Sequence, residues 1–457
     1  MQERLSCFKA YDIRGRVPDD LDTDLAQRIG RSFASWLRGD RVVIGHDIRL
    51  SSPEIKRAVV AGLLTGGAHV HDIGLCGTEE MYFAVAHYGM DGGIMITASH
   101  NPRDHNGMKL VRDGARPISG DTGLREIERM AAEESWTPST RLGTKQDLEH
   151  RIPYLRRLLS FVDVPALEPL RVVVNPGNGG AGVVLEALEP HLPFALEKMQ
   201  YDPDGHFPNG VPNPLLEENR AETSRKVVEN GADFGVAWDG DFDRCFFFDE
   251  TGRFVDGYYI VGLLAEAFLR KSPGEKIIHD PRLTWNTRDI CRQFTGRPIQ
   301  SKTGHAFIKE RMRTEKALYG GEMSGHHYFR DFDYCDSGMI PWLLVAELVG
   351  RTGKPLSQLL DERIERFPVS GEINRCLDDP LRALERVERL YGAEARAVDH
   401  TDGLAVELDG WRFNLRMSNT EPVVRLNVES DGDRALMERK TRELIQQLDG
   451  GVSAAAG

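Results

Sequence analysis

The alternation of short apolar runs with helical patterns is the feature that most constrains the fold of this chain. Residues 41–47 form such a run and lead into Ser51-Ser-Pro-Glu, where a proline near the first helical position favours a helix start. A similar apolar run followed by a polar or glycine-rich turn begins again near residues 171, 233 and 276. Strands that alternate with helices are typical of α/β folds with parallel pairing, which bind ligands beyond the carboxyl ends of their strands. We therefore predict α/β sheets and expect the functional residues just after the apolar runs.

Length and composition indicate a folded protein of several domains. At roughly 150 residues per domain, the 457 residues suggest about three or four domains. Hydrophobic residues make up 40% of the chain and charged residues 28%, which excludes global disorder. The 58 basic residues against 71 acidic ones give a formal net charge of −13. We therefore expect no nucleic-acid partner, and an anionic ligand needs a local basic pocket or a metal ion.

The N-terminal segment, the apolar stretches and the cysteines indicate the cellular location of the protein. The segment MQERLSCFKAYDIRG is charged and lacks the apolar core of a signal peptide. The best mainly apolar stretch, 338–349, contains Pro341 and Glu347 and is too short to span a bilayer. The six cysteines lie far apart without metal-ligand spacing, as expected for reduced thiols. We therefore predict a cytoplasmic protein with no membrane partner.

Turn-rich segments suggest where one domain ends and the next begins. The segment SWTPST at 135–140 is typical of a surface linker, Thr251-Gly252 suits a turn, and Phe367-Pro368 precedes a smaller unit. The predicted segments are domain I at 1–150, domain II at 151–252, domain III at 253–368, domain IV at 369–450 and a disordered tail at 451–457.

The last predicted domain has a pattern of its own. Alternating residues predict strands at 404–408 and 412–415, and a helical pattern near 434–448 closes the unit. We therefore predict an α+β fold for this part of the chain.

The first candidate loop follows the apolar run at 93–96 and contains Ser99-His-Asn-Pro102. Ser99 could act as a nucleophile with His100 beside it, because a serine needs help to lose its proton. An ordinary Ser/Asn turn after a strand explains the same residues. No G-x-S-x-G elbow is present, which disfavours a hydrolase of that kind.

The second candidate loop carries Asp239, Asp241 and Asp243 after an apolar run. Carboxylates at this spacing repel one another unless a cation lies between them, and their hard oxygen atoms suit Mg²⁺, especially beside a phosphate oxygen. An EF-hand is excluded because Arg244 stands at the sixth position, where glycine is needed, and a strand pattern follows. A solvated acidic turn remains the alternative to a divalent-metal site.

The third candidate loop, at 416–425, combines two guanidinium groups with hydroxyl and amide side chains. Such groups, together with loop N–H donors, can surround a phosphate, although an ordinary turn is the alternative. The chain has no GxxxxGK[ST] motif, so a nucleoside triphosphate site is not indicated. The candidate residues are Arg416, Ser418, Asn419, Thr420 and Arg425.

The fourth candidate loop, Gly320–His327, places Glu322 and Ser324 among glycines. A carboxylate and a hydroxyl in an exposed loop suit hydrogen bonds to neighbouring sugar hydroxyls, whereas ordinary loop residues are the alternative. The His326-His327 pair lacks the i, i+4 spacing of a helical zinc site. Taken together, the four loops favour phosphoryl transfer to and from a sugar phosphate through a phosphoserine, with Mg²⁺ neutralising its oxygen atoms.

Seven motifs occur in one order along the chain: KAYDIRG, TASHNP, NGMK, DGDFDR, KTGH, GEMSGH and RMSNTEP. Through them, essentially the whole sequence resembles the α-D-phosphohexomutases, and among these the bacterial phosphomannomutases. The resemblance implies four domains around a central cleft, with three α/β domains of shared topology and a smaller C-terminal α+β domain. Domains I to IV would carry, in order, the phosphoserine loop, the Mg²⁺ loop, the sugar-binding loop and the phosphate-binding loop.

The resemblance also implies roles for single residues. The catalytic residues would be Ser99, which holds the phosphoryl group, with His100, Lys109, Arg14 and Arg244. Lys109 matches a lysine proposed as a general acid/base. The metal ligands would be Ser99, through its phosphoryl group, with Asp239, Asp241 and Asp243. The substrate-binding residues would be Tyr11, Arg282, His305, Glu322, Ser324, Arg416, Ser418, Asn419, Thr420 and Arg425.

By the same resemblance, the chain would interconvert mannose 6-phosphate and mannose 1-phosphate through a 1,6-bisphosphate intermediate that reorients, feeding GDP-mannose and polysaccharide synthesis. The implied cofactors are one Mg²⁺ per chain and glucose or mannose 1,6-bisphosphate, the activator that phosphorylates Ser99. Its partners would be hexose phosphates, and the assembly a monomer or dimer. Phosphoglucomutase or dual activity is the main alternative. A sugar phosphatase or a noncatalytic sugar-phosphate binder is a more remote one.

Overall fold

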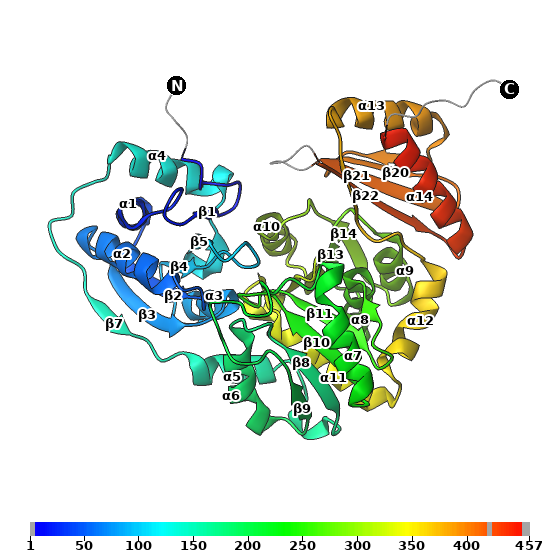
Figure 1. The fold of residues 1–457 in the computed structure, drawn as a ribbon, viewed down its shortest axis with the longest axis horizontal. Helices are drawn as coiled ribbons and strands as arrows, with labels where there is room; N and C mark the ends of the chain where they lie inside the picture. The colour runs from blue at the N-terminus through cyan, green and yellow to red at the C-terminus, as the bar shows by residue number, and fades with distance from the viewer. Residues whose placement is uncertain (1–4, 418–422, 450–457) are drawn as a thin grey trace. The chain divides into compact units, whose positions relative to one another are not determined.

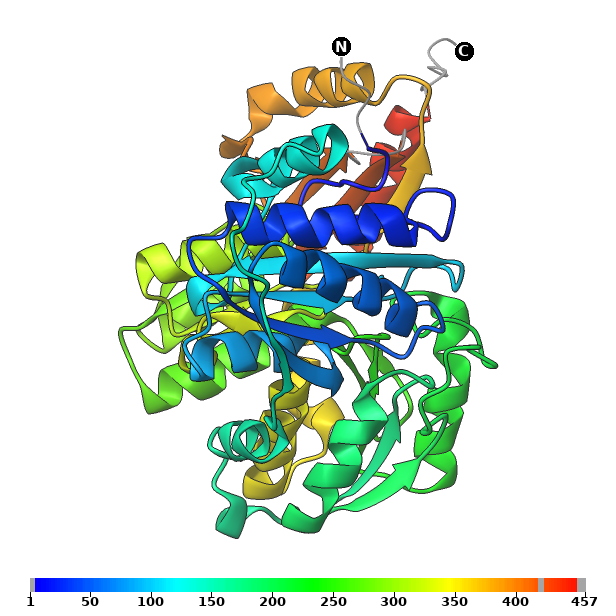
Figure 2. The same ribbon diagram turned by 90° about the vertical axis from the view of Figure 1, so that its left-hand side faces the viewer.

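The computed structural model describes residues 5–417 and 423–449 of the chain. The chain forms two compact units, each drawn from two stretches of sequence. The first unit comprises Met1–Val255 and Ser324–Pro355, and the second comprises Asp256–Met323 and Leu356–Gly457. Figures 1 and 2 show their helices and strands from two sides.

The first sheet of the first unit has the strand order β1-β5-β4-β2-β3-β7, with β6 paired to β5. Its strands are β1 (Ile13–Arg16), β2 (Arg41–His46), β3 (His69–Leu75), β4 (Gly92–Ile96), β5 (His105–Arg112), β6 (Arg116–Pro117) and β7 (Lys145–Asp147). β2 is parallel to β3 and β4, whereas β5 is antiparallel to β4 and to β1. The carboxyl ends of β2, β3 and β4 therefore meet at one edge of the sheet.

Four helices accompany this sheet: α1 (Thr23–Trp36), α2 (Ser52–Thr65), α3 (Thr78–His87) and α4 (Arg125–Glu133). Asp22 caps α1 by accepting a hydrogen bond from the N–H of Leu25, and a proline stands in the first turn of α2. α1 and α2 lie side by side (Figure 2) and bury apolar residues in one core with the sheet. The helix start predicted at Ser51-Ser-Pro-Glu is confirmed.

The second sheet of the first unit has the order β12-β11-β10-β8-β9. Its strands are β8 (Arg171–Asn175), β9 (Ala195–Lys198), β10 (Phe234–Trp238), β11 (Cys245–Asp249) and β12 (Phe254–Val255), and its helices include α5 (Arg151–Leu159), α6 (Ala181–Leu188) and α7 (Ala221–Glu229). β8 is parallel to β9 and β10, and β11 is antiparallel to β10. The order and directions of these four strands repeat those of β3, β2, β4 and β5. The first unit also contains β16 (His327–Phe329), β17 (Cys335–Asp336) and α11 (Met339–Thr352).

The second unit begins with three parallel strands in the order β14-β13-β15. They are β13 (Lys276–His279), β14 (Arg297–Gln300) and β15 (Tyr319–Gly321), accompanied by α8 (Gly257–Lys271), α9 (Trp285–Gln293), α10 (His305–Glu315) and α12 (Leu356–Arg366). This is the same arrangement of three parallel strands that each sheet of the first unit contains.

The C-terminal part of the second unit is an antiparallel sheet of order β18-β22-β21-β20-β19 (Figure 1). Its strands are β18 (Ile373–Cys376), β19 (Ala397–Asp399), β20 (Leu404–Glu407), β21 (Trp411–Met417) and β22 (Val423–Ser430), with helices α13 (Pro380–Tyr391) and α14 (Arg434–Leu448). Both helices share one apolar core with the strands. The predicted α/β sheets and the C-terminal α+β fold are therefore confirmed.

Short helical turns complete the described chain. They are η1 (Asp113–Ala115), η2 (Gly120–Leu124), η3 (Val164–Ala166), η4 (Glu189–His191), η5 (Glu217–Asn219), η6 (Arg330–Phe332) and η7 (Gly392–Glu394). Among the described residues, no helix combines the length and the apolar character needed to cross a membrane.

Candidate active site

Ser99 lies in the loop after β4 with a backbone conformation that side chains rarely adopt. Its φ is 49°, in the left-handed region, where a residue other than glycine is strained. Its N–H donates to Thr97 Oγ1 at 2.9 Å, and its carbonyl oxygen accepts from Arg49 Nη2 at 2.8 Å. The strained backbone and these two hydrogen bonds fix the direction in which the buried Oγ points.

Arg49, which follows β2, is hydrogen-bonded to the backbone of this serine loop. Its side chain is only 1% exposed, and Asp47 lies 3.5 Å from its Nε. The guanidinium donates to the carbonyl oxygens of Ser99 (2.8 Å), Asn101 (2.6 Å), Pro102 (2.7 Å) and His105 (2.9 Å). Arg49 was not among the sequence-based candidates, although it stands just after an apolar run, where functional residues were expected.

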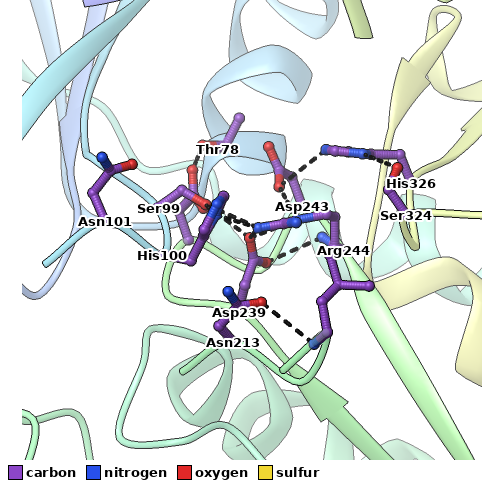
Figure 3. A network of polar contacts seen from close by, with 12 residues as sticks. Thr78, Ser99, His100, Asn101, Asn213, Asp239, Asp243, Arg244, Ser324 and His326 are labelled. Carbon is purple, nitrogen blue, oxygen red and sulfur yellow. Dashed lines mark hydrogen bonds and ion pairs between the residues drawn. The ribbon is translucent and has the colours of Figure 1, made fainter. Parts of the chain in front are cut away.

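The side chain of Ser99 meets groups from the aspartate loop, as Figure 3 shows. Its Oγ donates to Asp239 Oδ2 at 2.8 Å and lies 3.0 Å from His100 Nδ1. Arg244 Nη2 donates to Asp239 Oδ2 at 2.6 Å, to Ser99 Oγ at 3.4 Å and to His100 Nδ1. Because Nδ1 accepts from a guanidinium, we assign the ring proton of His100 to Nε2. Burial and then the charges of Arg244 and Arg14 hold the pKa of His100 well below its usual range, so its ring is neutral.

The three aspartates of the second loop follow β10 and form a buried cluster. Their carboxylate oxygen atoms lie within 4.8 Å of one another. In the part of the chain that the structure describes, Oδ1 of Asp241 and Oδ1 of Asp243 are buried without a hydrogen-bond partner. Burying such an oxygen without a partner costs free energy, which a bound cation would offset. The donor set of hard oxygen atoms therefore fits Mg²⁺.

Lys109 and the neighbouring charges set the protonation of this cluster. Lys109 Nζ, on β5, contacts Asp241 Oδ2 at 2.7 Å and also Asp243 Oδ2. Burial opposes its charge, but the two carboxylates outweigh burial and raise the pKa of Lys109 above its usual value. Burial raises the pKa of Asp239, whereas at Asp243 burial is outweighed by Lys109 and His326, which hold its pKa well below the usual range. Lys109 is therefore protonated in this structure.

Three further contacts join the aspartate loop to residues that follow strands of the first sheet. Thr78, the first residue of α3, donates from Oγ1 to Asp241 Oδ2, and its N–H donates to the Asp241 carbonyl oxygen at 3.1 Å. A Cβ placed at Gly240 would lie 2.7 Å from the carbonyl oxygen of Ser99. Only glycine therefore permits this approach of the two backbones. Thr78 was not predicted from the sequence, but it too follows a strand, β3.

Arg14 and Tyr11 lie at the edge of the first sheet. Arg14 is on β1, and its guanidinium donates to Asp12 Oδ2 and to Asn101 Oδ1, each at 2.7 Å. Burial opposes its charge, but Asp12, Asp241 and Asp243 raise the pKa of Arg14. Because Asn101 belongs to the serine loop, Arg14 is joined to that loop. Tyr11 is half-buried in the turn before β1.

His326, in the GEMSGH segment, contacts this centre. Its Nε2 lies 3.6 Å from Asp243 Oδ1, and its Nδ1 lies 3.4 Å from Ser324 Oγ (Figure 3). The same Nε2 lies 3.9 Å from Asp336 Oδ2. Sequence reasoning considered this histidine only as a zinc ligand and missed the contact. Ser324 belongs to the first unit and Glu322 to the second, so their joint action on one sugar stays a prediction.

In the second unit, Glu322, Arg282 and the loop before His305 come together. Glu322 follows β15 and is buried, and its Oε1 accepts from the N–H of Gly304 at 3.0 Å and lies 3.8 Å from Arg282 Nη2. Arg282 follows β13 and pairs with Asp280 at 2.9 Å. His305 is the first residue of α10. Three predicted substrate residues therefore lie beyond the carboxyl ends of β13, β14 and β15.

Arg416 and Arg425 are cross-strand neighbours in the C-terminal sheet, on β21 and β22. Asp402 Oδ2 lies 3.7 Å from Arg416 Nη1. Burial lowers the pKa of Arg416, and the nearby positive charges of Arg282 and Arg425 lower it further. Such a pair of like charges favours an anion between them. The other predicted phosphate ligands, Ser418, Asn419 and Thr420, lie outside the described residues.

Comparison with known proteins gives matches along the whole chain. Family profiles for phosphoglucomutase/phosphomannomutase match residues 6–138 as alpha/beta/alpha domain I, 153–252 as domain II, 256–367 as domain III and 372–446 as the C-terminal domain.

Individual relatives extend over the same length. A phosphomannomutase of Salmonella montevideo is 58% identical over 452 residues, which covers 97% of this chain and 99% of that protein. A phosphomannomutase of Escherichia coli K12 is 57% identical over 454 residues, covering 98% of this chain and 100% of that protein. A crystal structure of a phosphoglucomutase/phosphomannomutase family protein from Burkholderia thailandensis is 32% identical, with a TM-score of 0.88, and the match covers 100% of this chain and 99% of that chain.

Proposed function

The chain belongs to the phosphoglucomutase/phosphomannomutase family, and on that basis we propose that it interconverts mannose 6-phosphate and mannose 1-phosphate. As a member of this family it is an intramolecular phosphotransferase that acts on sugar phosphates. The two relatives named above are phosphomannomutases, which favours mannose phosphates. One observation carries the mechanism: the buried Oγ of Ser99 lies 2.8 Å from Asp239 Oδ2, in a carboxylate cluster that fits a divalent cation.

In the proposed reaction, the active chain carries a phosphoryl group on Ser99. The bond from phosphorus to Ser99 Oγ breaks, and a bond forms to the oxygen at C1 or C6 of the bound hexose phosphate, whose hydroxyl gives up its proton. Ser99 Oγ takes up a proton, so the products are a 1,6-bisphosphohexose and an unmodified serine. The intermediate then turns end over end and returns its other phosphoryl group to Ser99 Oγ, which gives up its proton while the sugar oxygen takes one.

The residues around Ser99 have separate proposed roles in neutralising charge and in transferring protons. Mg²⁺ held by Asp239, Asp241, Asp243 and a phosphoserine oxygen would neutralise charge on the phosphoryl group during transfer. Arg244 donates hydrogen bonds at Oγ and keeps His100 neutral and oriented, and Arg14 reaches the same loop through Asn101. We assign Lys109 a general acid/base role, because its Nζ lies in the carboxylate cluster, 2.7 Å from Asp241 Oδ2.

The substrate would be held at its two ends. We assign the non-transferring phosphate to Arg416, Ser418, Asn419, Thr420 and Arg425. The sugar hydroxyls at C3 and C4 are assigned to Glu322 and Ser324, with further contacts from His305, Arg282 and Tyr11. A clamp on O3 and O4 barely senses C2, where mannose and glucose differ, so phosphoglucomutase or dual activity is the second candidate.

Before the first turnover, the unmodified Ser99 must be phosphorylated by a bisphosphate. Glucose or mannose 1,6-bisphosphate is the proposed activator, because each can donate one phosphoryl group to Ser99 and leave a hexose monophosphate. A cytoplasmic location, a monomer or dimer, and delivery of the product to GDP-mannose synthesis stay predictions from the sequence.

A coupled assay tests the proposal, with mannose 1-phosphate and glucose 1-phosphate in separate reactions containing Mg²⁺ and a trace of glucose 1,6-bisphosphate. We expect mannose 6-phosphate to form with the higher kcat/KM. Comparable rates with both sugars would favour the dual enzyme. Release of inorganic phosphate without isomer formation would favour a phosphatase, and binding without either reaction would favour a sugar-phosphate binder.

A further inference from the structure

Three arginines of the second unit surround one carboxylate that no sequence motif singled out. Glu372 stands just before β18. Its Oε2 lies 3.4 Å from Arg282 Nη1 and 3.9 Å from Arg416 Nη2, and its Oε1 lies 3.7 Å from Arg425 Nη1. Both arginines assigned to the substrate phosphate therefore face the same glutamate.

The three contacts of Glu372 are not equivalent. The contact with Arg282 is a hydrogen bond, and Arg282 is itself held by Asp280 at 2.9 Å. The distances to Arg416 and Arg425 exceed hydrogen-bond length, so these two are loose ion pairs. The side chains of Glu372 and Arg425 are 24% and 36% exposed, which gives water and solutes access to the cluster. Glu372 is thus anchored on one arginine and attracts the other two at a distance.

The positions of the arginines explain why a negative charge is needed between them. Arg416 and Arg425 are cross-strand partners on β21 and β22, and like charges directly opposite each other destabilise a sheet. Asp402 contacts Arg416 through Oδ2 at 3.7 Å, which offsets part of one charge. Among the contacts described for Arg425, the carboxylate partner is Glu372.

We propose that Glu372 is an internal substitute for the substrate phosphate, neutralising Arg416 and Arg425 while the site is empty and competing with the phosphate for them. This inference rests on the proposed function, because it takes these two arginines as the phosphate site. The competition weakens phosphate binding. Since the bisphosphate intermediate must leave this site, turn and present its other phosphate, a resident carboxylate that takes over the arginines assists its release.

The experiment compares Glu372→Gln with the wild type in their unphosphorylated forms by isothermal titration calorimetry. Glutamine keeps the length of the side chain and an oxygen acceptor for Arg282 but removes the charge. A unit charge about 4 Å away in a largely hydrated site predicts that the Kd for mannose 1-phosphate falls about three- to tenfold. Inorganic phosphate should show a gain of similar size, and mannose, which lacks a phosphate, should show none.

Two further variants make the result decisive. Glu385→Gln, at an exposed position on α13, removes the same charge away from the arginines and should bind as the wild type does. Arg416→Ala should lose affinity for both phosphate ligands. If Arg416→Ala weakens binding but Glu372→Gln binds equally or more weakly while melting like the wild type, Glu372 serves only to orient the arginines and the inference is wrong. If Arg416→Ala also binds normally, the phosphate site of the proposed function is misplaced and the inference falls with it.

Discussion

The centre around Ser99 and the arginine cluster around Glu372 are built in opposite ways. At Ser99, Asp239 and Arg244, side chains are almost fully buried and joined by hydrogen bonds as short as 2.6 Å. At Glu372, the ion pairs are 3.4 to 3.9 Å long, and the side chains of Glu372 and Arg425 are partly exposed. Phosphoryl transfer needs reacting atoms at fixed separation, whereas a phosphate that must bind in two orientations needs contacts that release it. The comparison therefore associates rigidity with the chemistry and looseness with the turning of the intermediate.

Ser99→Ala should produce the largest effect, because it removes the atom that accepts the phosphoryl group. We expect kcat to fall by about 10³-fold or more while the melting temperature stays close to that of the wild type. Steady-state assays with mannose 1-phosphate and a thermal melt check this. Near-normal turnover by the variant would contradict a covalent phosphoserine. The centre around Ser99 would then not be the site of phosphoryl transfer.

Asp241→Asn should cost about 10²- to 10³-fold in kcat, because it removes a charge from the only three-aspartate group found among the described residues. EDTA should inactivate the wild type, and added Mg²⁺ should restore it. A rate that is unchanged after chelation would mean that the aspartate cluster holds no essential metal.

Arg49→Lys tests whether rigidity of the serine loop matters. Lysine keeps the charge but cannot reach four carbonyl oxygens at once, so Ser99 should lose its fixed position. We expect kcat to fall about 10- to 100-fold with KM changed by less than about threefold. Arg57→Lys, at an exposed position on α2, is the matched control. A raised KM with unchanged kcat would show that Arg49 acts on binding instead.

Arg425→Ala should weaken substrate binding at the arginine cluster around Glu372. Loss of a charge-assisted hydrogen bond to phosphate predicts that KM rises about tenfold, with a smaller change in kcat. Initial rates over a range of mannose 1-phosphate concentrations separate the two constants. A large loss of kcat at unchanged KM would mean that the arginine cluster takes part in the transfer step, and the division between the two regions would fail.

The smallest expected effect concerns Asp280, which pairs with Arg282 of the cluster at 2.9 Å. Burial at Asp280 is outweighed by Arg282 and by the N–H of Met323, which hold the pKa of this carboxyl below its usual value. A depressed folded-state pKa stabilises the fold above the unfolded pKa, and that stability is lost as the pH falls through the folded-state value. Asp280→Asn should lower Tm by about 2–4 °C at neutral pH, and its difference from the wild type should shrink below about pH 4. A difference that stays constant with pH would contradict the depressed pKa.

Local sequence patterns predicted much of the fold because they report which face of each element is buried. The helix expected near 434–448 is α14, and the strands expected at 404–408 and 412–415 are β20 and β21. The expectation that functional residues follow apolar runs singled out Ser99 and the three aspartates, and the structure places Ser99 Oγ 2.8 Å from Asp239 Oδ2. These features are local, so a single sequence can reveal them.

The residues that were missed act through contacts between distant segments. Arg49 is fifty residues from Ser99 in sequence, and Glu372 lies outside every motif, yet each is a partner of a predicted residue. Nothing in the residues around Arg49 or Glu372 indicates which backbone or side chain they meet. Such partners are fixed by the packing of one sheet or loop on another, which local patterns do not encode.

Gly240 has a consequence for how such an enzyme can evolve. A side chain at this position would clash with the backbone of Ser99. The separation of two loops from different sheets is therefore limited by this one contact. A change that moves one loop toward the other therefore needs a compensating change in the second loop. Random replacement at position 240 followed by selection for turnover should therefore return glycine, however freely the surrounding surface varies.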